Sequence, residues 1–298
     1  MEITLLFVYN PSAGKGKVAG KLSSIIYKFT QNGYKVTVHP TLRRLDGYEY
    51  IKEHGREYDA VVCSGGDGTL NETISGFIEG GVEVPLGYIP GGSANDTALT
   101  LKIPLDPEKS ADTAINGIPF PFDIGRFNER YFVYVAAFGA FSEVSYSTPQ
   151  DMKNALGHTA YIIEAIKRLP RIRSYKMRVE ADGQVFEDTF LFGAVCNTLS
   201  VGGGVLKFSS EYESLYDGEL EVLLLRDSKS LIDVGHIALC LLNQDYSDEN
   251  IVFFKTKHLT ITAEDDVPWT FDGEDGGAHS KAEITCVESP VRIMSGVK

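Results

Sequence analysis

Cysteine is scarce in this sequence, which has four among 298 residues. The four lie far apart in apolar runs, and their spacing to the histidines resembles none of the common zinc motifs. This distribution argues against a disulfide scaffold and predicts buried free thiols in a reducing cytoplasm.

Long apolar runs are missing as well. No stretch of the sequence reaches the roughly 18 consecutive apolar residues that a membrane-spanning helix needs. The segment Met1–Val8 has neither a basic region nor a small-residue cleavage site, so it predicts a strand and not a signal peptide. We therefore expect a cytoplasmic protein.

Positive charge is in short supply, because 28 Lys and Arg stand against 41 Asp and Glu for a formal charge of −13. Binding of nucleic acid needs a basic surface, so this balance argues against a nucleic-acid partner. One segment differs, since residues 167–178 hold six cations and no acid. That basic segment is either a solvated face or a patch for anionic lipid headgroups.

The stretch 60–72 organises the rest of the chain. An apolar run suited to a buried strand ends in Gly-Gly-Asp-Gly at 65–68, and helical spacing of apolar residues begins at Leu70. A strand, a glycine turn and a helix start place free backbone N–H groups and the positive end of the helix dipole together, which suits a phosphate. Asp67 would reach that phosphate through a metal ion. The alternative is a sharp turn that binds nothing.

The first 100 residues alternate between strands and helices. This alternation predicts a parallel sheet with helices on both faces. Ligands of such sheets bind beyond the carboxyl ends of the strands, where the loops at 10–16 and 64–69 lie. The expected strands are 2–9, 34–39, 58–64 and 84–89.

A second glycine turn follows the fourth strand. Residues 90–92 (Pro-Gly-Gly) lead into a helix with Ser93 or Asn95 as its N-cap. Asp96 is then a second carboxylate near the same edge of the sheet. It either caps the helix or shares a site with Asp67.

The loop after the first strand fits neither of two common nucleotide motifs. A Walker A loop would need glycine at Pro11 and a hydroxyl residue at Val18. Residues 14–19 fit G-x-G-x-x-A, but a dinucleotide site also wants an acid after the second strand, and residues 36–41 supply none. Both classes of site are therefore disfavoured.

Strand patterns dominate the chain from about residue 120, apart from expected helices at 151–169 and 231–242. They predict a second, mostly antiparallel β-sandwich domain. We expect domains at 1–125, completed by 288–298, and at 126–287, with the active site in the cleft between them. The expected strands are 122–126, 130–138, 175–180, 185–196, 218–225, 259–262 and 282–287.

Two acidic turns stand out in this second domain. Asp217 lies at a tight turn into a strand, and Asp272, Glu274 and Asp275 cluster after the only tryptophan, Trp269. From the residues alone, each turn is either an ordinary surface turn or a source of functional carboxylates.

Taken in order, these motifs resemble those of one known family. Residues 65–72 resemble the signature of the bacterial diacylglycerol kinase and lipid kinase family, which is related to sphingosine kinases and distantly to NAD kinases. The likeness runs from residue 3 to about 290. Its other parts are residues 10–14, Thr41, residues 90–96, Asp217-Gly218 with Leu220, and residues 271–274.

The resemblance implies an enzyme that transfers the γ-phosphate of ATP, with Mg²⁺, to a lipid alcohol such as diacylglycerol. Glu274 would be the general base, and Asp67 with Asp96 would orient Mg²⁺ and the phosphate. Asp217, with the backbone carbonyls of Ser214 and Glu219, would bind a structural Mg²⁺. The implied nucleotide contacts are Asn10, Pro11, Ser12, Ala13, Gly14, Thr41, Gly65, Gly66, Asp67, Gly68, Thr69, Leu70, Asn71, Glu72 and Ser93.

Two departures from the family pattern leave alternatives open. Ser93 replaces a threonine and Thr97 replaces a phenylalanine in the third motif. The acceptor could instead be a soluble molecule such as NAD, or the chain could be an inactive nucleotide- or lipid-binding regulator. A lipid acceptor also implies peripheral contact with a membrane surface. The oligomeric state stays open, a dimer included.

Overall fold

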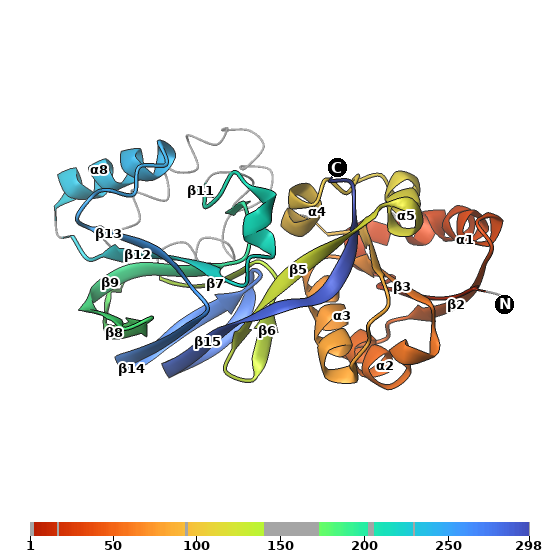
Figure 1. Cartoon of the computed structure of the whole chain (residues 1–298), viewed down its shortest axis with the longest axis horizontal. Coiled ribbons are helices and arrows are strands. Elements are labelled where there is room, and N and C mark those ends of the chain that lie inside the picture. Colours follow the sequence, from red (N-terminus) through yellow and green to blue (C-terminus); the bar gives the residue numbers. More distant parts are fainter. Residues whose placement is uncertain are drawn as a thin grey trace. The chain divides into compact units, whose positions relative to one another are not determined.

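The computed structural model describes residues 3–16, 18–92, 95–139, 173–201, 206–228 and 230–297. It divides into two compact units, the first made of Met1–Ile124 with Glu288–Lys298 and the second of Gly125–Val287 (Figure 1). Ser93, the helix expected at 151–169 and residues 167–172 of the basic segment lie outside the described residues.

The first unit is built on a parallel sheet in the order β2-β1-β3-β4. The end of β15 adds to it, because Ile293 pairs in parallel with Leu86. The central strands β1, β3 and β4 are mostly buried because both faces of the sheet are covered, whereas the edge strand β2 alternates between half-buried and exposed residues. The strands are β1 (Ile3–Tyr9), β2 (Tyr34–Pro40), β3 (Ala60–Gly65), β4 (Leu86–Pro90) and β15 (Glu274–Ser295).

Helices cover both faces of this sheet, with α1 and α5 on one side and α2 and α3 on the other (Figure 1). Phe29 of α1 and Ala111 of α5 share a buried cluster with Leu5 and Phe7 of β1. The helices are α1 (Leu22–Gln31), α2 (Asp46–His54), α3 (Asp67–Gly80), α4 (Asp96–Thr100) and α5 (Pro107–Asn116). Short 3₁₀ turns are η1 (Ala13–Gly16), η2 (Ala19–Lys21) and η3 (Gly55–Glu57).

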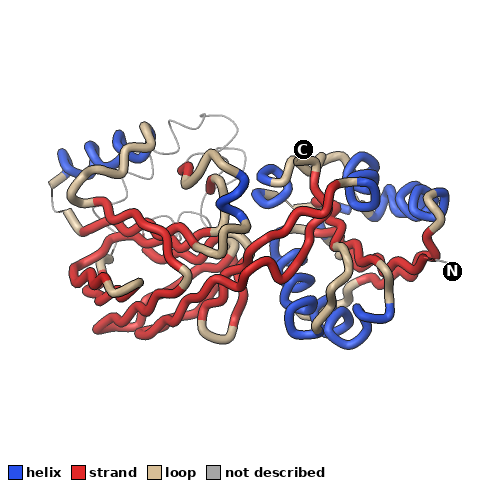
Figure 2. Tube along the Cα trace, viewed as in Figure 1, coloured by secondary structure: helices blue, strands red, loops and turns tan. Residues whose placement is uncertain are grey.

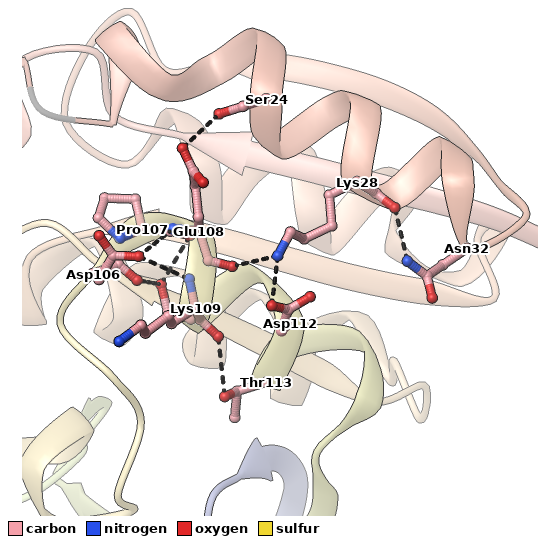
Figure 3. Close-up of polar contacts among 10 residues, drawn as sticks. Ser24, Lys28, Asn32, Asp106, Pro107, Glu108, Lys109, Asp112 and Thr113 are labelled. Atoms are coloured by element: carbon pink, nitrogen blue, oxygen red, sulfur yellow. Dashed lines mark hydrogen bonds and ion pairs between the residues drawn. The ribbon is translucent and has the colours of Figure 1, made fainter.

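The helix α5 is absent from the sequence prediction, although its start carries a clear signal. Asp106 is its N-cap and accepts the N–H groups of Glu108 at 3.2 Å and Lys109 at 3.0 Å, with Pro107 at the first helical position. Lys28 of α1 reaches across to this helix (Figure 3).

The second unit is rich in antiparallel strands (Figure 2). It contains η5 (Tyr212–Leu215) and the helix α8 (Leu231–Leu242), whose bounds agree with the prediction. Its strands are β5 (Ile118–Phe127, which starts in the first unit), β6 (Arg130–Phe132), β7 (Val135–Gly139), β8 (Tyr175–Ala181), β9 (Gln184–Cys196), β10 (Ser200–Val201), β11 (Leu206–Lys207), β12 (Leu220–Arg226), β13 (Ile251–Thr256), β14 (His258–Phe271) and part of β15.

Two clusters of buried side chains form the core of this unit. One contains Trp269, Phe138 and Ile284, and the other joins Ile237 and Leu241 of α8 to the strands below. Because alternate residues of a strand point to opposite faces, neighbouring residues of β12 contribute to different clusters.

The predicted fold class is confirmed: an α/β unit with helices on both faces precedes a mostly antiparallel β unit. A hairpin joins β8 to β9 at 181–184, and Asp182 and Gly183 have φ of 47° and 78°, as a two-residue type I′ turn requires. Across the described part of the chain, we find no helix that is both long and apolar enough to cross a membrane.

Candidate active site

Three glycine-bearing loops meet at the carboxyl ends of β1, β3 and β4. A Cβ on Gly14, whose φ is 58°, would lie 2.3 Å from the Gly91 carbonyl oxygen. A Cβ on Gly92 would lie 2.7 Å from Gly66 Cα, and the Gly91 N–H donates to the Gly65 carbonyl at 2.7 Å. Only glycine allows backbones to approach so closely.

Asp67 begins α3 and is half-buried at this meeting point. Its Oδ2 accepts the backbone N–H of Asn95 at 3.1 Å, so one carboxylate joins the two glycine turns. The N-cap residue, Gly66, is extended and its side-chain-free backbone leaves the first turn of α3 open to a ligand. A negatively charged group is stabilised there by the helix dipole.

Asn95 lies where the sequence predicts an N-cap, but its side chain does not cap α4. Its Oδ1 accepts the Gly92 N–H at 2.9 Å and its Nδ2 donates to the Gly92 carbonyl at 2.9 Å. With φ at 55°, Asn95 is left-handed and closes the turn on itself. Asp96 follows directly as the first residue of α4 and is half-buried.

The first loop is organised by Asn10. Its backbone N–H donates to Ser64 at 2.8 Å, and its Oδ1 accepts the N–H of Ser12 at 2.9 Å in a local turn. Ala13 donates back to the Asn10 carbonyl at 3.2 Å. Thr41 sits at the end of the next strand, where its N–H donates to Tyr9 at 2.9 Å. The loop is therefore held by β1 and β3 together.

Three of the predicted nucleotide contacts in α3, namely Leu70, Glu72 and Thr69, have packing or hydrogen-bond partners within the first unit. Leu70 is fully buried in the core, and its N–H donates to the Gly66 carbonyl at 3.1 Å. Glu72 Oε1 accepts the N–H of Leu45 at 2.9 Å, which ties α3 to the loop before α2. Thr69 packs under the turn, where a Cβ on Gly65 would meet its hydroxyl at 2.3 Å. Leu70 thus supports the turn from the core, and Glu72 ties α3 to the neighbouring loop.

The residues beneath the turn carry no charge at neutral pH. Tyr88 donates its hydroxyl to the Gly65 carbonyl at 3.1 Å, and burial together with the charge of Asp67 raises its pKa well above the usual range. Burial also raises the pKa of the Cys63 thiol to about 12. The Tyr88 and Cys63 side chains near Asp67 are therefore neutral.

In the second unit, Glu274 is exposed and follows the two-residue turn between β14 and β15. The carboxylate of Asp272 anchors that turn, because it accepts three backbone N–H groups, from Val133 at 2.7 Å, Tyr134 at 2.9 Å and Val135 at 3.1 Å. Sequence reasoning missed this role of Asp272, since its partners lie more than a hundred residues earlier in the chain.

Lys255 occupies the place beside Asp217 that the sequence prediction assigns to Mg²⁺. Its Nζ lies 2.6 Å from Asp217 Oδ2 and 3.3 Å from Oε1 of Glu221, and Asp217 Oδ1 accepts the Glu219 N–H at 3.0 Å. Ser214 is buried nearby in the chain, in η5. A metal ion at Asp217 Oδ2 would have to displace the ammonium, so this donor set does not fit Mg²⁺ while Lys255 is in place.

The carboxyl group of Glu221 lies beside the ammonium of Lys255. Its side chain is fully buried, and burial raises its pKa to about 7 against the opposing charge of Lys255. Lys255 thus compensates a buried carboxylate and a turn carboxylate together.

The described half of the basic segment is paired with acids. Arg173, Lys176 and Arg178 contact carboxylates of β14 or β8 at 2.5 to 2.9 Å. These pairs leave little net positive charge on that part of the surface. The cations Lys167, Arg168 and Arg171 lie outside the described residues.

Comparison with known proteins gives two family matches in succession. Residues 4–127 match the diacylglycerol kinase catalytic domain, and residues 135–294 match the YegS C-terminal NAD kinase beta sandwich-like domain. An α/β catalytic domain followed by this β-sandwich domain defines a lipid kinase, an enzyme that acts on an alcohol group.

Curated relatives match over most of their length. A diacylglycerol kinase of Bacillus subtilis (strain 168) is 33% identical over 272 residues, which cover 91% of this chain and 89% of the relative. One from Staphylococcus haemolyticus (strain JCSC1435) is 32% identical over 277 residues, covering 91% and 82%. This chain belongs to the diacylglycerol kinase family.

Solved structures share the fold. The crystal structure of a diacylglycerol kinase from Bacillus anthracis str. Sterne superposes with a TM-score of 0.76 at 20% identity, covering 99% of this chain and 97% of that one.

Proposed function

We propose that this chain transfers the γ-phosphate of ATP to the hydroxyl of diacylglycerol. One observation carries the proposal: Asp67 joins two glycine turns that each open a helix, α3 and α4, at one edge of a parallel sheet. Phosphoryl transfer depends on positioning and charge stabilisation more than on covalent chemistry, and such an edge supplies both. The names of the matching relatives support the acceptor.

The nucleotide is proposed to bind at the three loops. Backbone N–H groups at the start of α3 suit its phosphates, and the close packing of Gly14, Gly91 and Gly92 supports an uninterrupted backbone surface for them. Ser12 and Thr41 follow the neighbouring strands β1 and β2, and both are proposed to contribute to the same nucleotide site. Tyr88 and Cys63 beneath the turn are neutral, so they do not repel an anionic ligand.

Asp67 and Asp96 are proposed to hold Mg²⁺, since carboxylate oxygens are the hard donors that this ion prefers and both residues begin helices at adjoining turns. When bound, Mg²⁺ neutralises phosphate charge. Asp217, whose carboxylate pairs with Lys255, has no role in the proposed transfer.

Glu274 is proposed as the general base that takes the proton of the acceptor hydroxyl. It is exposed and therefore accessible to a substrate, and the Asp272 anchor gives its hairpin a defined position. A base in this role contributes a factor of ~10²–10⁴ to the rate. A lipid acceptor also requires peripheral contact of a cytoplasmic protein with a membrane surface, for which residues 167–172 are the proposed segment.

The test is incubation of the purified chain with labelled ATP, Mg²⁺ and separate acceptors. We expect label in phosphatidic acid when diacylglycerol is supplied. The second match, to an NAD kinase-like sandwich domain, keeps NAD as the competing acceptor. Label in NADP and none in lipid would decide for NAD, and nucleotide binding without any transfer would indicate an inactive regulator.

A further inference from the structure

Three side chains of different chemistry converge at the helix α8 of the second unit. His236 and Cys240 lie four residues apart on α8, and Asp248 reaches them from the loop before β13. The His236 Nδ1 lies 2.7 Å from Asp248 Oδ2 and 3.8 Å from Cys240 Sγ, and the three donor atoms all fall within 4.8 Å of one another. We propose that these residues bind a zinc-type divalent cation.

The helix supplies two of the ligands on one face. Residues four apart on an α-helix are neighbours on one face, so a single ion can contact both side chains. Ile237 and Leu241 pack into the buried cluster below α8 and fix the rotation of the helix. The side chain of His236 is 64% exposed, whereas Cys240 is buried in the cluster below α8, so an ion would enter from the side of His236.

The loop supplies the third ligand in a fixed orientation. Asp248 is only 10% exposed, and its Oδ1 accepts the backbone N–H of Asn250 at 2.8 Å and the side-chain amide at 3.0 Å. The loop is tied to the helix end, because the N–H of Asp245 donates to the Cys240 carbonyl at 2.8 Å. Such outer contacts orient a ligand and leave Oδ2 directed at His236.

The donor set selects the kind of ion. Sulfur, imidazole nitrogen and one carboxylate oxygen suit Zn²⁺, whereas Mg²⁺ and Ca²⁺ prefer oxygen alone. Bonds of zinc length in a tetrahedron place ligand atoms roughly 3.3–3.8 Å apart. The separation of Cys240 Sγ and His236 Nδ1 already fits, and the His236–Asp248 hydrogen bond would open by roughly 0.6 Å to admit the ion.

Charge and coordination number agree with this assignment. A thiolate, a carboxylate and a neutral imidazole together offset the two charges of the ion, so no further acid is needed. Three protein ligands leave one coordination position for water. The inference concerns α8 and its loop alone and does not depend on the proposed kinase chemistry.

Cobalt titration of the full, tag-free chain tests the site, because Co²⁺ bound by a thiolate absorbs in the near ultraviolet and Zn²⁺ displaces it. We expect one equivalent to bind with a thiolate band, the band to vanish in Cys240→Ser, and affinity for this equivalent to fall in His236→Asn and in Asp248→Asn by more than the roughly 10–100-fold that loss of an outer-shell partner costs. The matched controls Cys286→Ser and His258→Asn should bind like the original protein. Absence of stoichiometric binding, or a thiolate band that persists in Cys240→Ser while circular dichroism shows intact folding, overturns the proposal.

Discussion

Asp67 Oδ2 accepts a hydrogen bond of 3.1 Å from the backbone N–H of Asn95. This bond connects the start of α3 to the turn before α4, and the turn in turn is closed by the side chain of Asn95 on Gly92. The two glycine turns therefore behave as one structure, and a change in either should disturb the other.

Gly92→Ala should disrupt the joined turns. Its new Cβ would lie 2.7 Å from Gly66 Cα and 3.0 Å from Asn95 Oδ1, so the turns would have to separate. We expect a loss of about 1–3 kcal/mol in unfolding free energy, measured with urea, and a raised KM for ATP. Gly20→Ala, which meets nothing within 4 Å, is the control and should stay within about 0.5 kcal/mol of the original protein. Equal effects in both variants would contradict the account.

Asp272→Asn should weaken the hairpin that presents Glu274. The substitution removes the charge from a group that accepts three backbone N–H groups, and hydrogen bonds to charged groups contribute about 1.5–3 kcal/mol. We expect kcat to fall more than the affinity for ATP changes, measured by steady-state kinetics and nucleotide binding. Asp266→Asn, an exposed acid on the same hairpin, serves as the control and should leave kcat unchanged.

Lys255→Met should expose the role of the cation beside Asp217. In the original protein Mg²⁺ should add no stability at Asp217, because the ammonium of Lys255 already serves Asp217 and Glu221. The variant should be less stable than the original protein, most of all above pH 7, because Glu221, whose pKa burial raises to about 7, can take up a proton at lower pH and so avoid an unpaired buried charge. Added Mg²⁺ should recover part of this loss in the variant. An equal gain in melting temperature from Mg²⁺ in the original protein and in the variant would contradict this role of Lys255.

The two halves of the basic segment should differ in membrane binding. Reversing Lys167, Arg168 and Arg171 to glutamate should reduce sedimentation with vesicles that contain anionic lipid. Reversing Arg173 and Lys176 should change sedimentation little, because their charges are already paired with Asp265 and Glu264. If neither set of changes alters sedimentation with anionic vesicles, the basic segment does not bind the membrane.

The fold was accessible from the sequence where local patterns decide it. Apolar strands, glycine turns and helical spacing predict the first unit, since each of these signals lies within a few residues. The helix α5 was missed because its buried positions are small residues such as Ala111 and Ala114, which give little apolar periodicity. The strand β13 (Ile251–Thr256) was also missed.

The site was accessible only in part, for a related reason. Asn95 favours both the N-cap and the left-handed conformation, and only the contact with Gly92 separates the two. The anchoring of Asp272 and the pairing of Lys255 with Asp217 join residues distant in sequence, and no local pattern encodes such contacts.

The transfer reaction itself tests the central claim most directly. The purified chain, its Glu274→Gln variant and its Asp67→Asn variant are incubated with γ-labelled ATP, Mg²⁺ and diacylglycerol in detergent micelles, and labelled phosphatidic acid is measured. The account predicts product from the original protein, a loss of about 10²–10⁴ in rate for Glu274→Gln with ATP binding intact, and little product from Asp67→Asn. A Glu274→Gln variant that turns over at the original rate, or an original protein that labels no lipid, would contradict it.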